Sequence, residues 1–345
     1  MLDRQDAPLA PLTTLRLGGP ARRLVTVYDE ASLLAVLREG DGPLLVLGGG
    51  SNVVLPDDGI DGTVVRVQTR GIAVRGVAGG VAMEVAAGED WDLLVADTVA
   101  EGLAGMEALS GIPGSVGASP IQNIGAYGQE VAHTVTSVRA YDRQADVVVE
   151  LSAADCGFTY RSSTFKTDPG RWVVLSVAFL LQPGALSAPV GYAELARALG
   201  TRVGERAPLQ DVRDAVLRLR KGKGMVLDPT DPDTRSVGSF FTNPRLTPGQ
   251  LVDLQARVDE PVPTWPDTDG LVKVSAAWLI ERAGFGKGAF DGPVGISTKH
   301  TLALVHRGGG SSAALLGVAR TVRDEVRTRF GVELVNEPVL VGDRL

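Results

Sequence analysis

Two positive charges occur close together in the segment YRSSTFK, which runs from Tyr160 to Lys166. Arg161 carries a planar guanidinium that suits a carboxylate, and Lys166 adds a second cation. The segment therefore predicts binding of an anionic group. The alternative for Arg161 is an ordinary surface arginine at a strand end, and a single arginine without further context favours that alternative.

Ser239 and Glu337 are two further candidates for chemistry. Ser239 stands between Gly238 and two phenylalanines, a setting that predicts a dry and tight site. No paired histidine is evident, so a hydrolase triad has little support. Glu337 lies in an apolar stretch, where a carboxylate is costly unless it is paired or used. The simpler alternatives are a turn-forming serine and a solvated edge charge.

A first glycine loop follows the apolar residues 44–47. It consists of Gly48, Gly49, Gly50, Ser51 and Asn52. Successive glycines allow close backbone approach, and consecutive amides can form an anion-binding nest that would hold a pyrophosphate. The G-x-G-x-x-G spacing and the following helix of a Rossmann fingerprint are missing. A plain turn explains this loop equally well.

A second and longer loop, LSGIPGSVGASPIQNIGAYG, covers residues 109–128. A long glycine-rich loop inside a compact chain is usually functional. Its polar residues can serve ligand oxygens or merely cap their own turns; they are Ser115, Ser119, Gln122 and Asn123. Together, the two glycine loops suggest a dinucleotide held across two subdomains.

A basic cluster ends a predicted helix and leads into a stretch rich in glycine, proline and aspartate. It contains Arg218, Arg220, Lys221 and Lys223. These cations could form a local basic pocket for an anionic ligand. However, cations at a helix carboxyl end are favourable in any protein, so this signal is weak.

The hydrophobic patterns predict strands and helices that are mixed without strict alternation, which favours an α+β fold over a doubly wound parallel sheet. Strands are predicted at 24–28, 44–47, 63–67, 81–87, 135–141 and 173–181. Helices are predicted at 30–39, 91–101, 209–220, 274–284 and 312–330. Residues 183–191 and 221–238 have the composition of hinges or linkers.

Composition narrows the class of protein. The chain has 345 residues, which predicts two or three domains. Its formal net charge of −7 argues against nucleic-acid binding. Cys156 is the single cysteine, so an intrachain disulfide is impossible and a Cys/His metal site is not expected. The amino terminus does not read as a signal peptide, and the longest apolar run, residues 172–181, is too short to span a bilayer. We therefore expect a soluble cytoplasmic protein.

The motifs, taken in order, resemble the UDP-N-acetylenolpyruvoylglucosamine reductase (MurB) family, in particular its longer-chain branch. The resemblance covers essentially the whole chain. It runs through TTLRLGGPA (13–21), GGGSN (48–52), IPGSVGASPIQNIGAYG (112–128), YRSSTFK (160–166), the segment around Tyr192, GSFFTNP (238–244) and NEPVLVG (336–342).

The resemblance implies an FAD-binding fold of the vanillyl-alcohol oxidase type, with two α+β subdomains and a smaller α+β domain for the substrate. The expected boundaries are 1–70 with 331–345 for FAD-binding subdomain 1, 71–225 for FAD-binding subdomain 2, and 226–330 for the substrate-binding domain.

It also implies site residues. Arg161 would stabilise the developing enolate, Ser239 would protonate C2, and Glu337 would either orient that serine or stabilise the intermediate. FAD would be bound by Gly48, Gly49, Gly50, Ser51, Asn52, Ile112, Pro113, Gly114, Gly117, Ser119, Ile121, Asn123, Gly125 and Arg161. The substrate would be bound by Tyr192, Arg220, Lys223 and Asn243. The family's diphosphate lysine falls near Met225, and Lys223 lies two residues earlier, so this assignment departs from the pattern.

The implied activity is reduction of UDP-N-acetylglucosamine enolpyruvate to UDP-N-acetylmuramate in peptidoglycan precursor synthesis, through FAD and with NADPH. A monomer without nucleic acid, membrane or metal partners is expected. Two alternatives stay open at this point: another FAD-linked oxidoreductase on the same fold, and a non-catalytic protein that binds flavin or a UDP-sugar.

Overall fold

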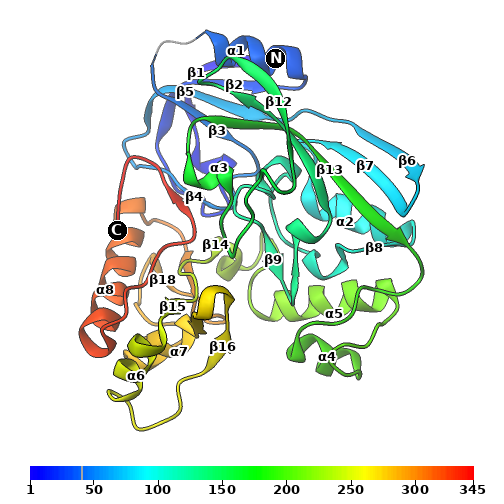
Figure 1. Cartoon of the computed structure of the whole chain (residues 1–345). Helices are drawn as coiled ribbons and strands as arrows, with labels where there is room; N and C mark the ends of the chain where they lie inside the picture. Colours follow the sequence, from blue (N-terminus) through cyan, green and yellow to red (C-terminus); the bar gives the residue numbers. More distant parts are fainter. Residues whose placement is uncertain (40–41) are drawn as a thin grey trace. The chain divides into compact units, whose positions relative to one another are not determined.

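The computed structural model describes residues 1–39 and 42–345 (Figure 1). These form two compact units. Unit 1 comprises Met1–Ala7, Pro20–Gly50 and Ile60–Gly222, and unit 2 comprises Pro8–Gly19, Ser51–Gly59 and Lys223–Leu345. The second predicted linker, 221–238, contains the last boundary between units, whereas 183–191 lies inside unit 1. The three-domain division stays a prediction.

The first sheet of unit 1 has the order β1-β2-β5-β3. Its strands are β1 (Leu2–Pro8), β2 (Pro20–Val27), β5 (Ile60–Val67) and β3 (Leu44–Leu47), and β5 pairs in parallel with both β2 and β3. Helix α1 (Glu30–Arg38) begins where the Asp29 carboxylate accepts a hydrogen bond from the amide of Ser32, and it buries Leu33, Val36 and Leu37.

The second sheet of unit 1 is antiparallel and has the order β12-β11-β13-β7-β6, with β8 attached to the end of β13. Its strands are β6 (Ile72–Val77), β7 (Gly80–Ala86), β8 (Leu103–Ala104), β11 (Val135–Asp142), β12 (Val147–Ser152) and β13 (Trp172–Pro183). The long strand β13, labelled in Figure 1, pairs with β11 on one side and with β7 on the other. Helix α2 (Trp91–Ala100) packs Trp91 edge-on against Phe179 of β13, with ring centroids 6.2 Å apart.

The other elements of unit 1 are short, apart from α5. They are η2 (Glu107–Leu109), η3 (Val116–Ala118), β9 (Gly125–Ala126), β10 (Gln129–Glu130), η4 (Val131–His133), α3 (Thr164–Thr167), α4 (Ala193–Leu199) and α5 (Leu209–Gly222). Helix α5 turns an apolar face toward α4, where Val212, Ala215 and Val216 pack with Leu195.

Unit 2 contains three small sheets, ordered β14-β19-β18, β15-β17-β16 and β20-β4. Its strands are β4 (Val53–Val54), β14 (Ser236–Ser239), β15 (Arg245–Leu246), β16 (Thr264–Pro266), β17 (Val272–Val274), β18 (Val294–Ile296), β19 (Ala303–His306) and β20 (Val339–Leu340). Its helices are η1 (Ala10–Leu12), η5 (Pro232–Thr234), α6 (Pro248–Gln255), η6 (Thr268–Gly270), α7 (Ala276–Arg282) and α8 (Ser312–Phe330).

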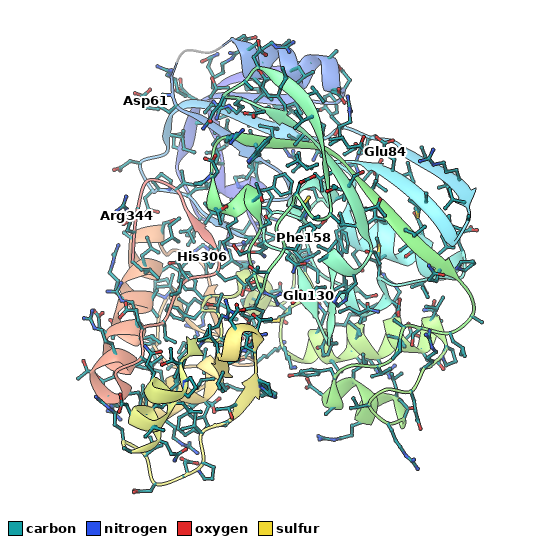
Figure 2. All side chains as sticks on the ribbon, in the orientation of Figure 1. Asp61, Glu84, Glu130, Phe158, His306 and Arg344 are labelled. Carbon is teal, nitrogen blue, oxygen red and sulfur yellow. The ribbon has the colours of Figure 1, made fainter. Side chains whose placement is uncertain are left out.

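Early segments of the chain are built into unit 2 by specific contacts. The Asp57 carboxylate accepts hydrogen bonds from the amides of Ser312 (2.7 Å) and Ala313 (2.9 Å), and so caps the first turn of α8. His306, labelled in Figure 2, has its Nδ1 2.9 Å from the carbonyl oxygen of Leu15, and its Nε2 accepts from the amide of Gly310. The early segments 8–19 and 51–59 are therefore packed as parts of unit 2.

The predicted α+β class is confirmed, as are the predicted long elements. All six predicted strands occur, as β2, β3, β5, β7, β11 and β13. All five predicted helices occur, as α1, α2, α5, α7 and α8. None of the helices in the described ranges is both long enough and apolar enough to span a bilayer.

Candidate functional site

The two glycine loops meet within unit 1. A Cβ atom on Gly49 would lie 2.6 Å from the Cα of Gly114, and one on Gly48 would lie 2.4 Å from the Oγ of Ser115. No side chain fits between the loops, so two stretches of bare backbone lie against each other. The contact fits the prediction that both loops serve one ligand. Such a cradle of amides suits a pyrophosphate.

The long loop is anchored on the second sheet. Gly117 donates its amide to the carbonyl of Ala87 at 2.8 Å, and a Cβ there would lie 2.5 Å from the Cβ of Ala87. Ser119 is buried, and its hydroxyl donates to the carbonyl of Val116 at 2.7 Å. The amide of Gly111 donates to Asp92 at the start of α2 at 2.6 Å. The loop is thus a fixed platform, and Ser119 caps its own turn.

Arg161 lies at the tip of a tight turn in unit 1. The residues on either side of the tip, Thr159 and Ser162, exchange backbone hydrogen bonds of 3.0 and 3.1 Å. Arg161 adopts a positive φ of 54°, a conformation that costs a non-glycine residue on the order of 1–3 kcal/mol. The Nη2 of Arg161 donates to the carbonyl of Gly125 at 2.7 Å, and the Nζ of Lys166 donates to the backbone carbonyl of Arg161 at 3.1 Å. Lys166 therefore supports the turn that presents Arg161.

A buried cation, Arg220, lies near Arg161, which is itself half-buried. Burial lowers the pKa of Arg220 to about 10, while Tyr127 and Asp92 act to raise it and the charge of Arg161 lowers it further. Arg220 and Arg161 are therefore close enough to influence each other, and this region of unit 1 favours an anion. Burial also raises the pKa of Tyr127 to about 12. The Tyr127 ring meets that of Tyr192 edge-on at 5.8 Å, so Tyr192 faces the same region.

Ser239, at the end of β14, and Glu337 lie on chain segments of unit 2 that meet through the residues beside them. The amide of Glu337 donates to the carbonyl of Phe240 at 2.9 Å, and Phe241 forms a β-bridge with Asn336. Both phenylalanine rings are buried and lie 5.2 Å apart, so they form an apolar backing for the strand that carries Ser239. The structure thus pairs the segments of two predicted catalytic residues that are far apart in the sequence.

The other predicted residues lie in different surroundings. Asn243 accepts a hydrogen bond from the amide of Ala276 at 3.0 Å, and so helps to cap α7.

Lys223 and Met225 are half-buried at the start of the last segment of unit 2, whereas Arg220 belongs to unit 1. Ser51 and Asn52 also belong to unit 2, where the carbonyl of Asn52 accepts from the amide of Val339 at 3.0 Å.

Sequence reasoning missed Glu107, which organises the segment leading to Tyr192. This carboxylate is buried and accepts from the amide of Gly105 (2.6 Å), the Nε2 of Gln129 (2.9 Å) and the amide of Ala188 (2.8 Å). It therefore fastens residues 183–191 to the start of the long glycine loop. No local pattern reveals this role, because Ala188 is far away in the sequence.

The fold and the glycine-lined platform define the class, an FAD-dependent oxidoreductase. A family model described as "FAD binding domain" matches residues 22–150. A second, described as "UDP-N-acetylenolpyruvoylglucosamine reductase, C-terminal domain", matches residues 228–341.

The chain belongs to the UDP-N-acetylenolpyruvoylglucosamine reductase family. It is 56% identical to the protein of that name from Thermobifida fusca, over 98% of each chain. It is 56% identical to that of Streptomyces coelicolor, over 98% of this chain and 90% of the relative. The crystal structure of the reductase from Thermus caldophilus matches 98% of each chain with a TM-score of 0.66 and 26% identity. The predicted family, fold and FAD cofactor are confirmed.

Proposed function

We propose that Arg161, Ser239 and Glu337 carry the chemistry of this family in the present chain. The chain reduces UDP-N-acetylglucosamine enolpyruvate to UDP-N-acetylmuramate, a step of peptidoglycan precursor synthesis. The observation that carries the assignment is the pairing of Phe240 with Glu337 through a 2.9 Å backbone hydrogen bond, which supports joint action of Ser239 and Glu337. The bound FAD would supply the hydride-transfer chemistry between NADPH and C3 of the enolpyruvyl group.

Arg161 is proposed to bind the enolpyruvyl carboxylate. Negative charge spreads onto that group as the enolate develops, so a fixed cation stabilises the transition state more than the ground state. The hydrogen bond to Gly125 and the support from Lys166 favour this role, because they fix the guanidinium in advance. The cost of the positive φ is typical of residues held in place for function.

Ser239 is proposed to donate the proton to C2, and Glu337 to assist it. The buried ring of Phe240 beside Ser239 supports a site that excludes water. A serine hydroxyl is a weak acid, so a neighbouring carboxylate that orients it, or that stabilises the intermediate, is needed. The backbone hydrogen bond between Glu337 and Phe240 is consistent with either task for Glu337.

The remaining residues are proposed as binding groups. The FAD set is Gly48, Gly49, Gly50, Ser51, Asn52, Ile112, Pro113, Gly114, Gly117, Ser119, Ile121, Asn123, Gly125 and Arg161. The substrate set is Tyr192, Arg220, Lys223 and Asn243. The contact of Gly49 with Gly114 supports the first set, and the mutual influence of Arg220 and Arg161 supports the second.

At a larger scale, we propose a cytoplasmic monomer that serves cell-wall assembly and thereby cell shape and division. The proposed domains are 1–70 with 331–345, 71–225 and 226–330.

The experiment that tests the proposal separates the two half-reactions of Ser239→Ala. Flavin reduction by NADPH, followed anaerobically by absorbance, should keep its wild-type rate. Reoxidation by UDP-N-acetylglucosamine enolpyruvate should slow by about a hundredfold or more, as expected for loss of a general acid. Ser137→Ala is the control, because that hydroxyl donates to Glu150 on a surface strand pair.

Two outcomes would contradict the proposal. Wild-type reoxidation in Ser239→Ala removes the proton-donor role from this serine. A wild-type protein whose flavin is reduced by NADPH but is never reoxidised by the UDP-sugar indicates an oxidoreductase with another substrate.

A further inference from the structure

We propose that Ser163 is a positioning residue for Arg161, because it ties the turn 159–163 that carries Arg161 to the long glycine loop 109–128. This inference rests on the proposed function of Arg161. Ser163 is 1% exposed, and its hydroxyl donates to the carbonyl of Ile121 at 2.6 Å. That hydrogen bond joins two segments that are distant in the sequence and both proposed to act in the reaction.

A second tie lies on the other side of Arg161. The Nδ2 of Asn123 donates to the carbonyl of Thr159 at 3.1 Å. Thr159 precedes the tip of the turn and Ser163 follows it, so Arg161 lies between two residues that are each bonded to the glycine loop. The guanidinium itself makes a third contact with that loop at Gly125.

The amide of Asn123 is held in one orientation by its surroundings. It is buried, its Nδ2 donates to Oε2 of Glu130 at 2.8 Å, and its Oδ1 accepts from the amide of Ala132 at 3.1 Å. Glu130, labelled in Figure 2, lies on β10. A carboxylate can only accept here, so it directs the NH₂ group of Asn123, which also donates to Thr159. The hydrogen bond to Thr159 is therefore held in place, and Ser163→Ala removes the other bond without altering Asn123, which is proposed to bind FAD.

The two ties matter because Arg161 has an unfavourable backbone conformation. A positive φ persists in a non-glycine residue only where its neighbours determine it. If Ser163 lost its bond, the turn could relax toward an ordinary φ and the guanidinium would leave Gly125. We call the two hydrogen bonds, from Ser163 to Ile121 and from Asn123 to Thr159, the clamp. With the clamp intact, the arginine turn and the glycine loop form one rigid body.

The kinetic test uses Ser163→Ala. Flavin reduction by NADPH should be unchanged, and reoxidation by the enolpyruvyl substrate should slow by about tenfold, as for one lost buried hydrogen bond. Ser162→Ala is the matched control, because it removes the adjacent hydroxyl and keeps the backbone bonds to Thr159. Ser163→Thr, which retains a hydroxyl, should recover most of the rate.

A double-variant cycle shows whether Ser163 acts through Arg161. In an Arg161→Ala background, Ser163→Ala should cause no further slowing, because the group it positions is gone. If Arg161→Ala alone leaves reoxidation at the wild-type rate, the role of Arg161 is wrong and the proposal falls with it. If Arg161→Ala slows reoxidation but Ser163→Ala still slows it tenfold more, only the positioning role is wrong.

A second readout does not depend on turnover. Amide hydrogen exchange of residues 159–163 in the flavin-loaded protein should become at least tenfold faster in Ser163→Ala, and stay at the wild-type rate in Ser162→Ala. Ser163→Cys, which is close in size and a weak donor, gives the same comparison if the alanine variant does not fold. Unchanged exchange in a folded Ser163 variant overturns the clamp.

Discussion

The guanidinium of Arg220 is buried in unit 1, and burial works against its charge. Burial lowers its pKa to about 10, so the folded protein binds this proton less strongly than the unfolded chain does. A basic group whose pKa is lower in the folded state than in the unfolded state destabilises the fold. This destabilisation is complete at every pH below the folded pKa, and it disappears as the pH rises from the folded to the unfolded pKa. The charge therefore reduces the stability of the ligand-free protein at neutral pH.

The prediction is that Arg220→Met stabilises the ligand-free protein by about 1–3 kcal/mol while weakening substrate binding. The gain should be constant near neutral pH and shrink only as the pH rises above about 10. Urea unfolding and substrate titration measure the two effects. Arg218→Met on the exposed face of the same helix is the control and should change neither. A destabilised Arg220→Met variant would show that the charge is well compensated in the fold.

At the scale of elements, the contact between the two glycine loops leaves no room for a side chain at position 49. A Cβ on Gly49 would lie 2.6 Å from the Gly114 Cα, so Gly49→Ala must push the loops apart. We expect the affinity for FAD to fall by at least about tenfold, as for an overpacked contact, in a fluorescence titration of the flavin-free protein.

Gly76→Ala on β6 is the matched control for this change. An added Cβ there meets nothing within 4 Å, so FAD affinity should stay at the wild-type value. Equal affinity in both variants would contradict a shared role of the two loops in cofactor binding.

Elements with a strong hydrophobic pattern could be predicted from the sequence. The spacing of apolar residues in α8 corresponds to a buried face that includes Leu315, Val322 and Val326. Strands β1, β6 and β12 were missed, because an edge strand needs no buried face. β6 is exposed along its length, and its sequence IAVRGV includes a glycine. Pattern reasoning detects burial, and these strands are held mainly by backbone pairing.

The candidate site was predictable only in part, for a similar reason. Arg161, Ser239 and Glu337 stand in recognisable motifs, whereas Ser163 and Glu107 act through backbone groups that any residue could supply. The partner of Ser163 is the carbonyl of Ile121, and one partner of Glu107 is the amide of Ala188. Because a backbone group accepts or donates these hydrogen bonds, the residue type at the partner position does not indicate them. Only the folded chain reveals them.

For the whole molecule, we expect FAD binding to raise the free energy of unfolding. A ligand at a hundred times its dissociation constant adds about 2.7 kcal/mol to the folded state. We expect removal of FAD to lower the melting temperature by several degrees, and addition of FAD to restore it. FMN is the control, because it lacks the diphosphate that the glycine loops are proposed to hold. Equal stabilisation by FMN would count against those loops as the diphosphate site.

Unit 2 is built from two early segments and one late segment of the chain, so it can fold only after synthesis has passed through unit 1. Residues 8–19 and 51–59 leave the ribosome early, yet their partners in unit 2, such as the first turn of α8, are made after unit 1. At the usual rate of translation, these early segments wait roughly ten to fifty seconds for their partners. A fragment that begins at Lys223 would lack the Asp57 cap and strand β4, so cutting the gene at that boundary would not yield a self-sufficient domain.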